Sequence, residues 1–159
     1  MDFSVIIPTL NEEKLLPNLL QQLNIKELRN KYKYEIIISD GGSTDKTIEK
    51  AKDLVEKYYV HNENFRQNIA MGRNKGREFA ESKILVFLSG DSRISDPVKL
   101  FDRIIEKVRD DKFVAFTCAV KVFPEETKFI DVIFQTFYNI YFHTLNIIGM
   151  GMGRGECNV

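Results

Sequence analysis

The sequence is poor in the features that mark several large classes of protein. Its 23 Lys and Arg residues balance 23 Asp and Glu residues, so the formal net charge is zero. General binding to a nucleic-acid backbone needs a surplus of cations, and we therefore expect no nucleic-acid partner. The only cysteines are Cys118 and Cys157, too few for a disulfide framework or a four-ligand zinc site.

The amino-terminal segment also lacks the marks of secretion. Asp2 follows the first methionine, and neither a basic stretch nor a long apolar stretch comes next. A signal peptide needs both, so the expected location is the cytoplasm. Internal repeats, low-complexity segments and linkers are also missing from the sequence.

Length and composition fit one ordinary globular domain. The chain has 159 residues, of which 43% are hydrophobic, 11% aromatic and 29% charged. A chain of this length buries roughly 68–70% of its unfolded surface when it folds, which suffices for a core without disulfides or metals. We therefore expect a single domain over residues 1–159.

Apolar runs rich in β-branched residues alternate with segments whose apolar residues recur every three to four positions. The runs predict strands and the periodic segments predict helices. Strands are expected at residues 3–8, 34–40, 58–61, 83–89 and 113–122. Four helices are expected. The first covers residues 15–23, with Pro17 in its first turn, and the second follows a cap at Ser43 or Thr44. The third covers residues 68–81, and the fourth begins at Pro97 after a cap at Asp96. Strands separated by helices imply an α/β fold with a mainly parallel sheet and helices on both faces.

Carboxylates follow three of the predicted strands. Glu12 follows the first, Asp40 ends the second, and Asp91 follows the strand at residues 83–89. Ligands of open parallel sheets bind at the carboxyl ends of the strands, so we expect these three side chains to converge. There they can accept hydrogen bonds from a base or a ribose, or hold a hard divalent ion that bridges phosphates.

Each of these carboxylates has an alternative role as a helix cap or turn former, which Asp and Asn often fill. We prefer that role for Asp45 and Asp96. For Asp40 and Asp91, each directly behind a long apolar strand, we prefer a functional role.

Three segments together resemble one known family. They are SVIIPTLNEE, EIIISDGGSTDKT and NIAMGRNKGREFAESKILVFLSGDSRI, and their order and spacing are similar to those in the amino-terminal half of family 2 glycosyltransferases. The resemblance runs to about residue 93 and is looser beyond it. It implies a Rossmann-like GT-A fold and a nucleotide-diphosphate sugar as the donor.

The resemblance assigns nucleotide contacts to individual positions. Pro8, Leu10 and Glu12 match a first-strand loop that cradles the base and the ribose. Asp40 matches an aspartate that hydrogen-bonds the base. Arg73 matches an arginine close to the nucleotide, and its equal alternative is a cation on the surface of a helix.

The family's Asp-x-Asp signature, which binds the metal and the diphosphate, falls at Ser89, Gly90 and Asp91. Asp91 is then the expected ligand of Mg²⁺ or Mn²⁺. Ser89 offers only a neutral hydrogen bond, which we expect to go to the ribose. Losing one carboxylate weakens the electrostatic hold on the metal.

The implied reaction is an inverting sugar transfer, in which a metal offsets charge on the departing nucleoside diphosphate and a carboxylate deprotonates the acceptor hydroxyl. The family supplies this base from an acidic motif that would lie beyond residue 159. Glu156 is the candidate within the chain, although a loop role is the commoner one for such a residue. We therefore expect the chain to bind the donor and to transfer sugar poorly by itself. The acceptor, a sugar or a lipid-linked molecule, stays open.

Two other functions stay open. A non-catalytic nucleotide-binding module of the same fold is favoured by Ser89 and by the missing base. A nucleotidyltransferase of related topology would need a glycine-rich, basic loop after the first strand, where residues 9–12 read TLNE.

Residues 129–148 (FIDVIFQTFYNIYFHTLNII) are long and apolar enough to suggest a membrane helix. Polar residues nevertheless draw one stripe along it: Asp131, Gln135, Asn139, His143 and Asn146. We expect this helix to be buried against the sheet or against a further part of the domain. The alternative is a helix that lies on a membrane surface, with the protein peripheral to the membrane. If the helix and a sheet edge were exposed, homo-oligomers would be expected.

Overall fold

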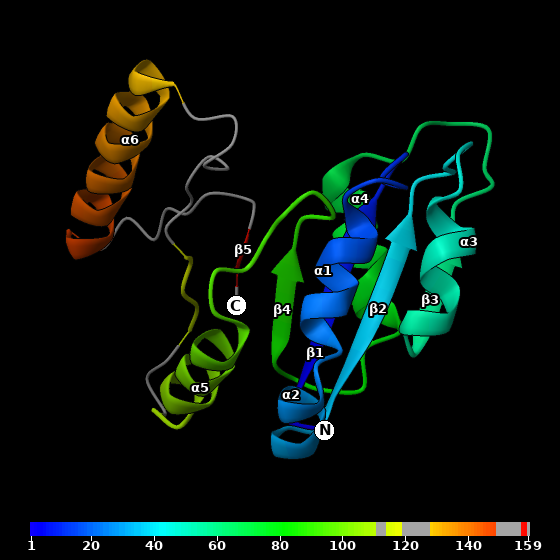
Figure 1. Cartoon of the computed structure of the whole chain (residues 1–159), viewed down its shortest axis with the longest axis horizontal. Helices are drawn as coiled ribbons and strands as arrows, with labels where there is room; N and C mark the ends of the chain where they lie inside the picture. Colours follow the sequence, from blue (N-terminus) through cyan, green and yellow to red (C-terminus); the bar gives the residue numbers. More distant parts are fainter. Residues whose placement is uncertain (111–113, 119–127, 149–156, 159) are drawn as a thin grey trace.

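The structure, a computed structural model, describes residues 1–110, 114–118, 128–148 and 157–158. Its centre is a sheet in the order β3-β2-β1-β4-β5 (Figure 1). The strands are β1 (Phe3–Thr9), β2 (Tyr34–Asp40), β3 (Lys57–Val60), β4 (Leu85–Leu88) and β5 (Cys157–Asn158). The first four run parallel, and β5 pairs antiparallel with β4. The expected α/β fold with a mainly parallel sheet is confirmed.

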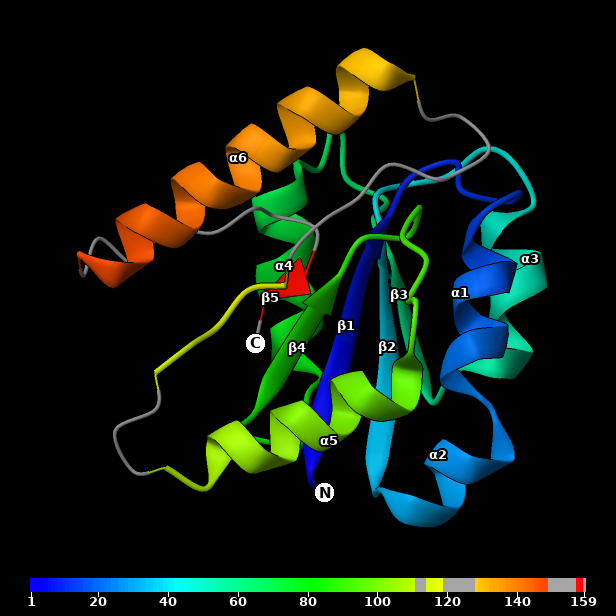
Figure 2. The same cartoon turned by 60° about the vertical axis from the view of Figure 1, so that its left-hand side comes forward.

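Helices cover both faces of this sheet. They are α1 (Leu16–Leu23), α2 (Lys26–Lys31), α3 (Thr47–Ala51), which continues into the 3₁₀ turn η1 (Lys52–Leu54), α4 (Ile69–Glu78), α5 (Pro97–Val108) and α6 (Phe129–Ile147). Side chains of α1, α2, α3 and α5 join one large core, whereas α4 packs on the other face of β1 and β2. Figure 2 shows α5 and α4 on opposite sides of the strands.

The first strand is mostly apolar because it is covered on both faces. Phe3, Val5 and Ile7 belong to the large core, and the intervening Ile6 lies under α4, against Gly76. All four side chains are fully buried. A parallel strand covered in this way reads as a continuous hydrophobic run, which is why the sequence pattern identified it.

Of the three helix starts that were predicted from a proline or a capping residue, two are confirmed. Pro17 lies in the first turn of α1, and Asp96 caps α5 by accepting a hydrogen bond from the backbone N–H of Lys99. The cap at Ser43 or Thr44 is wrong, because α3 begins only at Thr47. The hydroxyl of Ser43 is engaged instead with the loop that follows β1.

The strand expected at residues 113–122 is also wrong where the structure describes it. Of residues 114–118, only Thr117 forms an isolated bridge, and the others lie outside any strand. The neighbour of β4 on that side is β5, which pairs Leu88 with Cys157. Residues 111–113 and 119–122 lie outside the described residues.

The long apolar helix α6 does not pack on the sheet, so its expected burial there is wrong. It stands apart from the strands in Figure 1. Phe129, Phe134 and Phe137 are exposed, whereas Gln135 on the polar stripe is only half-exposed. Within the described part of the chain, no helix has both the length and the hydropathy needed to cross a bilayer.

A buried carboxylate joins the strands at the amino edge of the sheet. Glu35 on β2 is 1% exposed and accepts hydrogen bonds from Ser4 Oγ at 2.6 Å, Lys57 Nζ at 2.8 Å and the backbone N–H of Glu81 at 2.6 Å. Burial alone raises the pKa of this carboxyl, but the bonds from Lys57, Ser4 and Glu81 outweigh burial and leave its pKa below the usual 4.5. The charged form is therefore the one that the fold stabilises.

The contact of α4 with β1 leaves no room for a side chain at Gly76. A Cβ added there would lie 2.4 Å from Cγ2 of the buried, β-branched Ile6. We predict that Gly76→Ala lowers the free energy of unfolding by about 1–3 kcal/mol, the usual cost of overpacking, although alanine is the better helix former. Urea denaturation measures this. The exposed Arg77→Ala on the same helix serves as control, and a Gly76→Ala variant as stable as the parent would contradict the packing argument.

Candidate functional site

The carboxyl ends of β1, β2 and β4 meet around the side chain of Thr9. Its hydroxyl donates to Asp40 Oδ1 at 3.0 Å, across the register pair that joins the two strand ends. Its methyl group lies 3.3 Å from the point where a Cβ of Gly90 would stand. The loops after the three strands therefore share one edge of the sheet, as expected from the sequence. Thr9 itself was not among the predicted site residues.

Asp40 is the centre of the loop that follows β2. Its side chain is fully buried, and both carboxylate oxygens accept hydrogen bonds from the protein. The donors are Thr9 Oγ1, Ser43 Oγ and the backbone N–H groups of Gly42 and Ser43, at 2.5–3.0 Å. The carboxylate that was expected to contact a base thus lies inside the loop and holds its shape.

The loops after β1 and β2 are joined by a row of hydrogen bonds from backbone to side chain. Three consecutive backbone N–H groups, those of residues 11, 12 and 13, donate across the gap. Their acceptors are Ser43 Oγ at 2.8 Å, Thr47 Oγ1 at 2.8 Å and Asp45 Oδ2 at 3.2 Å. Asp45 also accepts from the backbone N–H of Thr47 at 3.0 Å. These contacts agree with the preferred turn-forming role of Asp45.

Glu12 and Asp91 come together on the large-core side of Thr9. The Cγ atom of Glu12 lies 3.3 Å from the place of a Gly90 Cβ, so a side chain at residue 90 would displace it. Burial raises the pKa of Glu12, and the negative charges of Asp91 and then Asp45 raise it further. Carboxylates that repel one another in this way form a site of high negative potential.

A tight turn presents Asp91 at this edge. After β4 the backbone N–H of Ser92 donates to the carbonyl of Ser89 at 3.0 Å, which closes the turn. Gly90 is buried within the turn, Ser89 is half-exposed, and Asp91 is exposed to solvent. The turn thus directs a carboxylate outward, where a soluble ligand can reach it.

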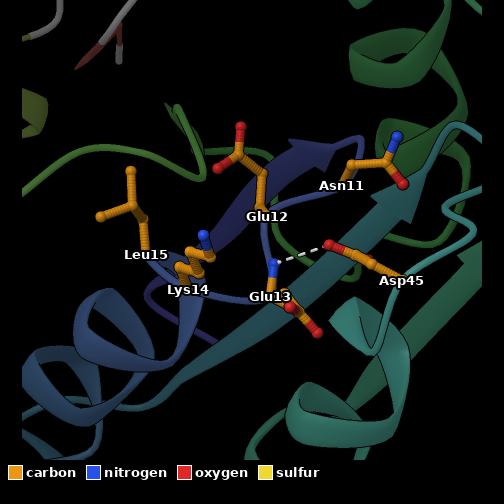
Figure 3. A pocket seen from close by; sticks show the side chains of 6 residues that line it. All are labelled: Asn11, Glu12, Glu13, Lys14, Leu15 and Asp45. Atoms are coloured by element: carbon orange, nitrogen blue, oxygen red, sulfur yellow. Dashed lines mark hydrogen bonds between the residues drawn. The ribbon is translucent and has the colours of Figure 1, made fainter.

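A hollow of about 360 Å³ lies beside Glu12, between the loop after β1 and the loop that leads into α3 (Figure 3). Its lining residues are Asn11, Glu12, Glu13, Lys14, Leu15 and Asp45. Figure 3 shows the bond from Glu13 to Asp45 along one side of it. Three carboxylates, those of Glu12, Glu13 and Asp45, are among its lining residues.

Two other predicted residues, Pro8 and Leu10, lie on the α4 side of β1. The Cβ atom of Pro8 is 3.1 Å from the place of a Gly72 Cβ, and Cδ1 of Leu10 is 3.6 Å from that of Gly41. Because side chains alternate along the chain, Pro8 and Leu10 lie on the opposite side from Thr9. Glu12, beyond the left-handed Asn11, lies with Thr9 beside Gly90. The predicted residues thus form two groups rather than one.

Arg73 lies on α4 and is half-buried. Its guanidinium carbon lies 5.8 Å from the ring centroid of Phe87 on β4, within the range of a cation–π contact. This contact places Arg73 on the α4 face of the strand that leads to Ser89.

Among the described residues, no three His, Cys, Asp or Glu side chains cluster closely enough to hold a metal ion. Glu12 and Asp91 supply two oxygen ligands of the kind that Mg²⁺ and Mn²⁺ accept. They fit such an ion as a partial set that a bound phosphate would complete. Glu156 lies outside the described residues.

The profile of one protein family, Glycosyl transferase family 2, matches residues 4–151. A dolichol-phosphate mannosyltransferase from Pyrococcus furiosus is 31% identical over 121 residues, which are 72% of this chain and 32% of that protein. Across the curated relatives, the matched part spans between 19 and 36% of their length.

Two solved structures share the fold. S. aureus TarS 1-349 in complex with UDP-GlcNAc aligns with a TM-score of 0.56 at 23% identity, over 78% of this chain and 37% of that chain. Mannosyltransferase PcManGT from Pyrobaculum calidifontis, in complex with GDP-Man and Mn²⁺, aligns with a TM-score of 0.63 at 21% identity, over 99% of this chain and 43% of that chain. The expected Rossmann-like GT-A fold is confirmed.

The loop after β1 depends on an unusual backbone conformation at Asn11. Its φ of 57° is in the left-handed region, and its Oδ1 accepts from the backbone N–H of Thr44 at 2.9 Å. We predict that Asn11→Ala, which keeps the strain and loses the bond, lowers the free energy of unfolding by about 1–2 kcal/mol. Asn11→Gly relieves the strain and should cost less. Urea denaturation of both variants tests this, and equal losses would show that strain is not the cause.

The repulsion between Glu12 and Asp91 predicts a measurable change of pKa. Asp91→Asn removes the negative charge next to Glu12, so the pKa of Glu12 should fall toward its usual 4.5. Titration of the Glu12 carboxyl by NMR in metal-free buffer measures it, with the exposed Asp53→Asn on η1 as control. An unchanged pKa of Glu12 would mean that the two carboxylates are not neighbours in solution.

Proposed function

The chain belongs to glycosyl transferase family 2, and we propose that it is the donor-binding part of a glycosyltransferase that uses a nucleotide-diphosphate sugar. The observation that carries this proposal is the meeting of Glu12 and Asp91 beside Gly90, at the carboxyl edge of a parallel sheet. Ligands of such sheets bind at this edge. The UDP-GlcNAc and GDP-Man named for the two neighbours are donors of this class.

The diphosphate belongs, in this proposal, on the side of Glu12 and Asp91. Two carboxylates there would repel a bare diphosphate, so a divalent cation is needed between them. Asp91, which is exposed, and Glu12 would hold Mg²⁺ or Mn²⁺ through their oxygens, with phosphate oxygens as further ligands. When bound, the ion offsets negative charge on the departing nucleoside diphosphate.

Ser89 would then take a different part. It occupies the first position of the expected Asp-x-Asp signature and is half-exposed next to the turn. Its hydroxyl can donate to or accept from a ribose hydroxyl but cannot supply charge to a metal. The proposed metal site therefore has fewer protein carboxylates than that signature would supply.

The two loops after β1 and β2 hold this edge in place before any ligand arrives. Their row of hydrogen bonds fixes the backbone at residues 11–13, and the buried Asp40 fixes the loop opposite. A preorganised site loses less conformational entropy on binding, which favours affinity for a small charged ligand.

The residue that deprotonates the acceptor hydroxyl is not assigned. None of the described carboxylates near the edge is proposed for it, because Glu12 and Asp91 are taken by the metal and Asp40 is saturated with donors. The proposal is therefore limited to donor binding, and a non-catalytic nucleotide-binding module is the second candidate. The small number of metal-binding side chains in the described residues favours that second candidate.

Calorimetric titration with UDP and with GDP separates these functions. We predict that at least one of them binds in the presence of Mn²⁺, and that Asp91→Ala weakens this binding by about tenfold or more, which corresponds to about 1.4 kcal/mol. The exposed Asp53→Ala is the matched control and should bind like the parent. Binding that is indifferent to Mn²⁺ would favour the module, and no binding of either nucleotide would overturn both functions.

A further inference from the structure

The side chain of Gln67 is largely buried, and its amide makes no hydrogen bond to the described residues. Gln67 is 9% exposed, in the segment between β3 and α4. Its amide atoms are not fully enclosed, so a ligand at this edge of the sheet can reach them. The amide therefore has unused capacity to donate and to accept.

This amide lies at the same sheet edge as the candidate site, on its α4 side. Its Nε2 atom is 3.0 Å from the place of a Gly72 Cβ and 3.8 Å from that of a Gly41 Cβ. Gly41 directly follows β2, and Leu10, which was predicted to contact the nucleotide, lies against the same glycine. Side chains at residues 41 and 72 would close the space that the amide occupies.

The backbone on both sides of Gln67 is held firmly. On one side Asn68 caps α4, with its Oδ1 accepting from the backbone N–H of Met71 at 2.9 Å. On the other side the backbone N–H of His61 donates to the carbonyl of Asp40 at 2.8 Å, and the ring of His61 lies 2.7 Å from the carbonyl oxygen of Phe65. The segment that carries the amide is thus tied to the end of β2.

Gln67 directly precedes the N-cap of α4, a position that often holds an apolar residue. The residue before an N-cap often packs against the fourth residue of the helix, which here is Gly72. Gln67 does lie over Gly72, but it brings a carboxamide where a hydrophobic side chain would suffice for packing. Packing alone therefore does not account for the polar group.

We propose that the Gln67 carboxamide hydrogen-bonds the base of the bound nucleotide, as a donor and an acceptor set beside the edge of that base. This inference rests on the proposed donor-binding function. Asp40, the residue expected to meet the base, has both oxygens occupied by protein donors. The nearby group with a free donor and a free acceptor is the amide of Gln67.

The chemistry of the amide matches a particular base edge. Uracil and guanine, the bases of the nucleotides named for the two structural neighbours, each carry an N–H beside a C=O. A carboxamide offers an acceptor and a donor side by side, so it pairs with such an edge through two hydrogen bonds. Cytosine also has a donor beside an acceptor, so a carboxamide turned by 180° pairs with it as well. Methylation of N3 in uracil, or of N1 in guanine, removes the N–H and leaves the pair incomplete.

Calorimetry on the full chain with UDP, GDP and their N-methylated forms (at N3 of uracil and N1 of guanine), each with Mn²⁺, tests the proposal. The parent should prefer UDP or GDP to its methylated form, which lacks the N–H. Gln67→Met keeps the length of the side chain and removes both polar groups, so it should weaken the preferred nucleotide by about tenfold and reduce the preference over the methylated form. Gln67→Glu keeps only the acceptor and should lose part of the same preference. Inorganic pyrophosphate with Mn²⁺ is the control ligand, and its affinity should be unchanged in both variants.

The outcomes separate this inference from the function on which it rests. If the parent binds neither UDP nor GDP, the donor-binding function fails and takes the inference with it. If the parent binds and Gln67→Met shows the same affinity and the same preference, the inference alone is overturned. If Gln67→Met lowers the affinity for nucleotides and for pyrophosphate to the same extent and also lowers the melting temperature, the role of Gln67 is structural. That result would overturn the inference as well.

Discussion

The carboxyl edge of the sheet depends on one buried carboxylate. Asp40 lies at the end of β2 with no exposure to water, so its charge must be compensated inside the protein. Its donors come from Thr9 at the end of β1 and from the loop after β2, and they draw these two segments together. This arrangement allows the row of hydrogen bonds between the two loops. It also allows the left-handed conformation of Asn11 and the position of Glu12. Removing the charge would therefore disturb the shape of the edge before it disturbed any ligand contact.

The alternation of Pro8, Thr9 and Leu10, followed by the left-handed Asn11, divides the edge into two sides. On the large-core side lie Glu12, Gly90 and Asp91, which carry negative charge and suit a cation with a diphosphate. On the α4 side lie Leu10, Gly41 and Gln67, which offer an apolar surface and one amide. A nucleotide has the same division, with a flat base at one end and charged phosphates at the other. A single strand end can thus sort the two halves of one ligand.

Much of the fold could be predicted from the sequence, because β1, β2 and the starts of α1 and α5 are local patterns of apolar residues, proline and caps. The strand at residues 113–122 was predicted from an apolar run alone. In the structure β4 pairs with β5 and residues 114–118 form no strand, and this long-range pairing cannot be seen in a local pattern. The carboxylates of the site were identified because each follows a strand. Thr9 and Gln67 were missed because their roles depend on contacts with Asp40 and Gly72 across 31 and 5 positions of the chain. A glutamine directly before an N-cap was the one local signal for the second of them.

The ion pair of Glu35 and Lys57, at the opposite edge, couples unfolding to proton uptake. The pKa of Glu35 in the fold lies below the usual 4.5, so the unfolded chain binds a proton there more readily than the folded chain does. The stability that this carboxylate contributes is complete above the pKa of the unfolded chain and is lost as the pH falls through the lowered value. Glu35 thus makes the amino edge of the sheet sensitive to acid, as the lowered pKa of Asp45 does for the loops at the other edge.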